Sequence, residues 1–191
     1  TITVTMINDW VAQKLTTQKP ATVKREFDTL KAILNDAVRS EKLAKNPSDL
    51  ADPIRGIVGR QRFLNGDEAV RLLSVAEEAA DWLPDFILWA LHSGMRKSEI
   101  TGLIWDDIHA LPNRQVYAIV RHGKNDRPRM VHCTKTMQEV LERQKERQVE
   151  GNKSVFPVTK MTLRRKWEQA RAQAGLEDVT LHDLRRTNAT M

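Results

Sequence analysis

HDLRRT at residues 182–187 is the run that decides the fold when it is read with GMRKSE at residues 94–99. His182 and Arg185 are three positions apart, so they share one face if the run is helical. The upstream run adds Arg96, and a guanidinium stays protonated at neutral pH while offering paired donors to phosphate oxygens. The two runs therefore predict three side chains that converge on one phosphate.

Each of these residues also has a plainer interpretation. Arg96 alone would be a surface or helix-capping cation, and His182 alone would be a cap or a satisfied polar residue. Lys124 alone would be a solvated turn lysine, and a basic cluster alone is ordinarily a solvated face. The order and spacing of the residues favour the shared site over these separate explanations.

The composition limits the class of protein. The 191 residues are 40% hydrophobic, enough for one core or for one core with a small satellite domain. Lys and Arg outnumber Asp and Glu by 31 to 25, which favours a polyanionic partner such as nucleic acid. The single cysteine, Cys133, excludes an internal disulfide framework and a Cys-rich zinc site, and it fits the cytoplasm. No signal-peptide pattern or membrane-length apolar run is present, so we expect no membrane partner.

Apolar spacing predicts two domains. An amphipathic helix over 21–40 and a shorter one around 7–15 form a small helical module. The stretch 46–56 is rich in turn residues and lacks periodicity, so it is interpreted as a linker. The expected boundaries are therefore 1–56 for the helical module and 57–191 for the second domain.

The second domain is predicted to be mainly helical with a few strands. Asn65 and Glu68 have capping-box spacing at the start of one helix, and Gly94 suits a left-handed end to another. The expected elements are helices over 65–75, 82–92, 135–148 and 159–174, a helix from Arg96, and strands over 115–120 and 129–133 around a polar turn. The fold class is mainly α with a small antiparallel β-sheet (α+β).

These motifs resemble those of the tyrosine recombinases, the phage integrase family. Residues 93–108 look like the family's first arginine box, and residues 182–187 look like its second. Lys124, in the turn between the two strands, resembles the family's hairpin lysine. The resemblance runs from about Phe63 onward, while the first module is similar to the family's core-binding domain in position and pattern.

The resemblance implies a site-specific recombinase that breaks and rejoins double-stranded DNA through a 3′-phosphotyrosyl link. It implies no metal and no cofactor. Arg96 and Arg185 would stabilise the pentacoordinate transition state, and Lys124 would protonate the departing 5′-oxygen. His182 would hydrogen-bond the phosphate or assist proton transfer, and Glu99 would support the arginines as a buried acidic partner. The family also implies a phage or mobile-element role and a homo-oligomer, a tetrameric synapse, on DNA.

Basic residues near these motifs predict the DNA-contacting surface. They gather in the expected hairpin, on the helix over 159–174 and on one face of the helix over 21–40. The candidate DNA contacts are Lys24, Lys31, Arg121, Arg127, Arg129, Arg164 and Arg165.

The sequence departs from the family pattern at the nucleophile. The only tyrosine, Tyr117, lies in a predicted strand and upstream of the second box, so we interpret it as structural. We therefore expect the nucleophile to follow Met191 in a longer protein, and we expect these 191 residues not to cleave DNA. Asn188 stands where the family usually has an apolar aromatic residue, which bears on the packing of the last helix.

Two other functions fit the motifs. A type IB topoisomerase uses similar arginine, lysine and histidine roles, and DNA relaxation without strand exchange would identify one. A non-catalytic DNA-binding regulator could keep the fold without the nucleophile. A downstream tyrosine in the parent reading frame supports the recombinase, and a stop codon there supports the regulator.

Overall fold

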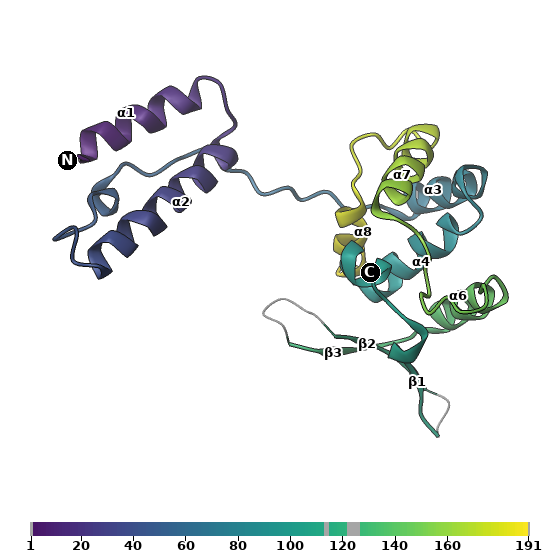
Figure 1. The fold of residues 1–191 in the computed structure, drawn as a ribbon. Coiled ribbons are helices and arrows are strands. Elements are labelled where there is room, and N and C mark those ends of the chain that lie inside the picture. Colours follow the sequence, from purple (N-terminus) through teal and green to yellow (C-terminus); the bar gives the residue numbers. More distant parts are fainter. Residues whose placement is uncertain (1, 113–114, 122–126, 191) are drawn as a thin grey trace. The chain divides into compact units, whose positions relative to one another are not determined.

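The computed structural model describes residues 2–112, 115–121 and 127–190, and it divides into two compact units, Thr1–Gln61 and Arg62–Met191 (Figure 1). The boundary expected after residue 56 thus lies after Gln61 in the structure. Across the described residues, no helix has the length and apolarity that a membrane crossing requires.

The first unit is built from α1 (Val4–Leu15), α2 (Pro20–Arg39) and the short 3-10 helix η1 (Pro47–Leu50). Thr3 caps α1 by accepting a hydrogen bond from the Met6 backbone N–H, and a proline at its first position starts α2. The apolar stripes of the two helices meet in a small core of Ile7, Val11, Val23, Phe27 and Leu34.

Part of the stretch interpreted as a linker belongs to this unit. Asn46 is buried, and its Nδ2 donates to Asn35 Oδ1 at 2.6 Å while its Oδ1 accepts from the Ser48 backbone N–H at 2.9 Å. Asn8 Nδ2 donates to Asp52 Oδ2 at 2.8 Å. These turn residues therefore belong to a folded part of the first unit. The residues after Asp52 continue to the second unit without helix or strand.

The second unit is mainly helical with one small sheet, which confirms the predicted fold class. Its elements are α3 (Gly66–Ala79), α4 (Leu83–Ser93), α5 (Lys97–Thr101), η2 (Trp105–Asp107), β1 (Ile108–Ala110), β2 (Val116–Val120), β3 (Arg129–His132), α6 (Lys135–Glu146), α7 (Lys160–Gln173) and α8 (Leu181–Asn188). The strands form an antiparallel sheet in the order β1-β2-β3, with Ile108 opposite Ala118 and Val120 opposite Arg129. The sequence did not predict β1, which has only three residues.

Helix α4 is the centre of the second unit. Its residues are apolar on nearly every side, as expected for a helix surrounded by others. Phe86 and Trp89 both pack edge-on against Phe156, with ring centroids 5.5 and 5.9 Å apart. Because α4 contacts α3, α6 and α8, its position sets theirs.

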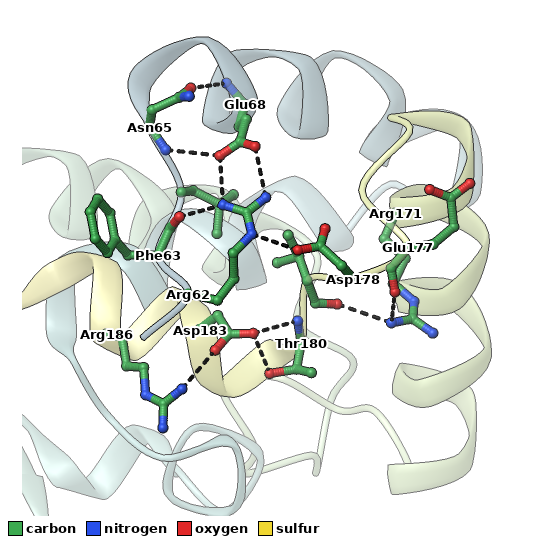
Figure 2. Close-up of polar contacts among 12 residues, drawn as sticks. Arg62, Phe63, Asn65, Glu68, Arg171, Glu177, Asp178, Thr180, Asp183 and Arg186 are labelled. Atoms are coloured by element: carbon green, nitrogen blue, oxygen red, sulfur yellow. Dashed lines mark hydrogen bonds and ion pairs between the residues drawn. The ribbon is translucent and has the colours of Figure 1, made fainter. Parts of the chain in front are cut away.

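The entry of the chain into the second unit is fixed by Arg62 (Figure 2). Its guanidinium donates to both oxygens of Glu68, at 2.7 and 2.8 Å, and its Nε donates to Asp178 at 2.7 Å. Hydrogen bonds from Arg62, and then from the Asn65 backbone N–H, lower the pKa of Glu68 to about 2. The predicted capping box of Asn65 and Glu68 is confirmed. This network joins α3 to the loop that precedes α8.

A buried carboxylate joins α4 to α6. Asp85 accepts hydrogen bonds from Arg143 at 2.8 Å, from Gln144 at 2.7 Å and from Arg147 at 2.8 Å, and its side chain is 4% exposed. Arg143 and Gln144 lie in α6, and Arg147 is the residue that caps its C-terminal end. A carboxylate that is paired in this way is tolerated in the interior. Its removal would leave the three donors without their shared acceptor.

We expect Asp85→Ala to lower the free energy of unfolding of the second unit by about 3 kcal/mol, because it leaves a buried amide and two arginines without their carboxylate. Asp81→Ala is the matched control. Asp81 is 72% exposed and its carboxylate lies 3.8 Å from Arg147 Nε, so this ion pair is weak and its loss should cost less than about 1 kcal/mol. Urea unfolding followed by tryptophan fluorescence measures both. Equal losses would contradict the assigned role of Asp85.

Candidate active site

The turn between α4 and α5 places Arg96. Gly94 ends α4 in the left-handed region, with φ at 57°, as the sequence predicted. Arg96 then precedes α5, and its backbone N–H donates to Glu99 Oε2 at 2.7 Å. The GMRKSE run therefore forms a helix end followed by a helix start, with the Arg96 side chain at the junction.

Asn188 holds α8 against this turn. Its Nδ2 donates to the Leu91 carbonyl oxygen at 2.7 Å, which satisfies one of the free carbonyls at the end of α4. A Cβ at position 94 would lie 2.6 Å from Asn188 Oδ1, so the close approach itself requires glycine. At the position where the family usually has an aromatic residue, Asn188 thus caps the end of α4 with a polar contact. Sequence patterns gave no signal for this contact, since it joins residues 97 positions apart.

Contacts at the start of α8 determine which of its two arginines is available to bind a ligand. The buried Asp183 carboxylate accepts from Thr180 N at 2.9 Å and from Thr180 Oγ1 at 2.7 Å (Figure 2). Arg186 turns to the same carboxylate, with Nη1 3.2 Å from Asp183 Oδ1. Arg186 therefore serves the local structure, and Arg185 lies on a different side of the helix.

Arg96, His182 and Arg185 line one pocket of about 480 Å³. The start of α5 forms one wall, and α7 and the start of α8 form the others. The remaining lining residues are Met95, Lys97, Ser98, Arg164, Trp167, Glu168, Arg171, Thr180 and Leu181. His182 is exposed, so its imidazole is accessible from solvent. Two guanidinium groups and an imidazole in one pocket form an arrangement suited to an oxyanion.

Glu99 lies between two arginines. Its side chain is 4% exposed, and its oxygens accept from Arg96 Nη1 at 2.7 Å and from Arg129 Nη1 and Nη2 at 3.0 and 2.7 Å. Burial alone would raise the pKa of Glu99, but hydrogen bonds from Arg129, then from the Arg96 backbone and guanidinium, outweigh burial and lower it to about 2. Arg129, a predicted DNA contact, donates from both terminal nitrogens to this carboxylate, and its side chain is 35% exposed.

Arg185 is the least compensated cation of the site. Its Nη1 is buried and has no hydrogen-bond partner among the described residues. Burial, and next the positive charge of Arg96, lower the pKa of Arg185 from its usual range. A guanidinium still keeps its proton at neutral pH, so the lowered pKa means that the buried cation is destabilised. An anion in the pocket would relieve that cost.

The other predicted site residues are distributed as follows. Lys124 lies outside the described residues. In the first unit, Lys24 pairs with Asp28 and Lys31 pairs with Asp49. In the second unit, Arg121 pairs with Asp107, Arg164 pairs with Glu168, and Arg127 and Arg165 are exposed. The pairs of Lys24, Lys31 and Arg164 are exposed and contribute little free energy, so these three cations can exchange partners, whereas the Asp107 partner of Arg121 is buried.

Tyr117 does not face the arginines. Side chains alternate along a strand, and Ala118 and Val120 of β2 point into the core. Arg129 is opposite Val120 and therefore lies on the same face of the sheet. Tyr117 lies on the other face, where its ring stacks on His109 with centroids 5.3 Å apart.

Comparison with known proteins identifies the family. Residues 62–191 match the phage integrase family. The chain belongs to this family. That match spans the second unit, and it confirms the resemblance inferred from the two arginine boxes.

Relatives of this integrase-family chain are longer than it is. A Haemophilus influenzae protein assigned as an integrase/recombinase is 24% identical over 184 residues, covering 91% of this chain and 50% of its own length. The shufflon-specific DNA recombinase of Escherichia coli is 30% identical over 165 residues, covering 86% of this chain and 41% of its own. The chain therefore spans about half the length of the curated relatives that it matches.

Solved integrase structures share the fold. A lambda integrase dimer bound to a COC′ core site has a TM-score of 0.79 at 21% identity, covering 99% of this chain and 72% of that one. The Tn1549 transposon integrase, in complex with circular intermediate DNA, has a TM-score of 0.78 at 17% identity, covering 100% and 72%.

We expect the stability that Glu99 provides to depend on acid pH. Because its folded-state pKa is lowered, its contribution is fully present above the unfolded value of about 4.3 and is lost as the pH falls through about 2. At neutral pH, Glu99→Gln should lower the free energy of unfolding by on the order of 3 kcal/mol, at about 1.4 kcal/mol per pKa unit. The difference between wild type and variant should shrink below about pH 4. Denaturant unfolding at a series of pH values measures it, and a pH-independent difference would contradict the lowered pKa.

Proposed function

We propose that this chain is part of a site-specific DNA recombinase, an integrase, that binds duplex DNA and holds the scissile phosphate between Arg96 and Arg185. The observation that carries the proposal is the pocket where both guanidinium groups meet His182, with Arg185 Nη1 lacking a partner among the described residues. Family membership supports the same conclusion.

The two arginines would act mainly on the transition state. Charge accumulates on the non-bridging oxygens as the phosphodiester is attacked, and preorganised donors stabilise that charge more than they stabilise the ground state. Arg96 is fixed by Glu99, and Arg185 is fixed by the anchored helix α8, so both are preorganised. His182 would hydrogen-bond the phosphate or assist proton transfer, and the family resemblance assigns the general acid to Lys124.

The proposed partner is double-stranded DNA, and the proposed active assembly is a homo-oligomer. Among the structures that share the fold are a lambda integrase dimer bound to a core site and a lambda integrase tetramer bound to a Holliday junction. The second of these has a TM-score of 0.78 at 20% identity, covering 99% of this chain and 59% of that one. We propose a tetramer on DNA for the longer protein.

We further propose that these 191 residues alone do not cleave DNA. Tyr117, the only tyrosine of the sequence, stacks on His109 on the face of the sheet away from Arg129 and Glu99. The nucleophile would then come from a longer protein that contains this chain. We place its action in the cytoplasm, because the single cysteine of the sequence, Cys133, is free and buried, which fits a reducing compartment.

DNA binding should weaken steeply with salt, because Lys and Arg contacts to phosphates release condensed counterions. For several such contacts, we expect a loss of about 10³-fold between roughly 50 and 200 mM salt. Replacing Arg164 and Arg165 by Gln should reduce the slope of log affinity against log salt by about 1 for each lost contact. Fluorescence anisotropy over a salt series measures both, and salt-independent binding would overturn the DNA assignment.

With a nicked suicide DNA substrate, the 191-residue chain should form no covalent adduct, and Tyr117→Phe should change nothing. The longer protein should form the adduct, because the arginine clamp acts on a transition state that only a positioned phenolate can generate. In that protein, Arg185→Ala should slow cleavage by about 100-fold or more. Its affinity for DNA should stay within a few-fold.

Denaturing gels detect the adduct. A covalent band from the 191-residue chain that Tyr117→Phe abolishes would show Tyr117 to be the nucleophile and overturn this part of the proposal.

A further inference from the structure

The hydrogen bonds of Glu99 fill its acceptor capacity. A carboxylate offers about four lone-pair positions. Oε1 accepts from Arg96 Nη1 and Arg129 Nη1, and Oε2 accepts from the Arg96 backbone N–H and Arg129 Nη2. Arg129 therefore supplies two of the four bonds with a bidentate fork. Among the described residues, the Arg96 guanidinium donates to this carboxylate from one nitrogen only.

Arg185 is electrostatically coupled to the same carboxylate but does not bond to it. The negative charge of Glu99 acts to raise the pKa of Arg185, while burial and the positive charges of Arg96 and Arg129 lower it. No hydrogen bond joins Arg185 to Glu99 among the described residues, and Arg185 Nη1 has no partner there. The Glu99 carboxylate, whose charge also acts on Arg185, is thus hydrogen-bonded by the other two arginines.

We propose that Arg129 is a positioning residue that keeps the other two arginines available for an oxyanion. By saturating Glu99, it removes the acceptor to which Arg185 and the remaining donors of Arg96 would otherwise be drawn. Without Arg129, the 4% exposed carboxylate would lack two hydrogen bonds, and an unsatisfied buried charge is costly. The nearest cations would then turn from the pocket to Glu99. This inference rests on the proposed oxyanion site.

The contacts of Arg129 favour this role over direct contact with DNA. Both terminal nitrogens of Arg129 donate to Glu99, so the guanidinium fork is directed at the carboxylate, although the side chain is 35% exposed. Arg129 also begins β3 opposite Val120, which holds its backbone in the sheet ladder. Arg71 belongs to α3 of the same unit, is exposed, and is neither a lining residue of the pocket nor a predicted DNA contact, which makes it a matched control for loss of one positive charge.

Sulfate binding to the 191-residue protein tests the proposal by isothermal titration calorimetry. Arg129→Gln should weaken sulfate binding by about tenfold, a size typical of coupling between contacting residues. Arg71→Gln should weaken it by less than about twofold, as expected for an exposed charge. In a Glu99→Gln background, adding Arg129→Gln should cost less than about twofold, because no competing carboxylate remains.

A second variant and a spectroscopic signal distinguish the loss of arginine positioning from simple unfolding. Arg129→Lys keeps the charge but offers no fork, so it should lie between wild type and Arg129→Gln. In the sulfate-free protein, the ¹⁵N–¹H signal of Arg185 Nε should shift in Arg129→Gln, since Arg185 would then pair with Glu99. The signal should stay in place in Arg71→Gln.

The outcomes separate the two proposals. Equal losses for Arg129→Gln with and without Glu99, or losses equal to those of Arg71→Gln, would overturn the positioning role while leaving the oxyanion site intact. An unshifted Arg185 signal in Arg129→Gln would do the same. Absence of sulfate binding by the wild-type protein would overturn the oxyanion site, and the positioning role with it.

Discussion

Repulsion between like charges is the constraint that the site must overcome. Arg96, Arg129 and Arg185 come from three different elements, and the cost of bringing their charges together is highest where water is excluded. One buried carboxylate, Glu99, supplies the compensating charge. It neutralises only part of the total, so the site remains electropositive. A bound phosphate would neutralise the remaining positive charge.

A rigid frame is needed to keep the three arginines from moving apart under their mutual repulsion. The frame is α4, whose end is bonded to α8 through Asn188 and whose start is bonded to α6 through Asp85. On its other side, α8 is held where Thr187 accepts a hydrogen bond from the Leu64 backbone at 2.9 Å. Arg185 therefore sits on a short helix that is anchored at several points, and it cannot readily swing away from Arg96.

Local signals in the sequence predicted much of this arrangement. The amphipathic stripes, the capping box at Asn65 and the left-handed end at Gly94 depend on neighbours within a few positions, and each was predicted. The joining of Arg96, His182 and Arg185 in one pocket was also predicted, from the three-residue spacing of His182 and Arg185 and from the order of the two motifs. The contacts that were missed join distant residues. Nothing near Asn188 indicates Leu91, and nothing near Arg129 indicates Glu99, because such pairs are defined only by the completed fold.

The anchoring of Arg62 determines how long the tether between the two units is. Asp52 is bonded within the first unit, Ile54 packs against the core of that unit, and Arg62 is bonded within the second, so residues 55–61 connect the two. Seven extended residues reach about 25 Å at most. Two units that contact the same ligand through so short a tether would raise each other's effective concentration to roughly the millimolar range. Two individually weak contacts with one ligand would then bind as a single strong one.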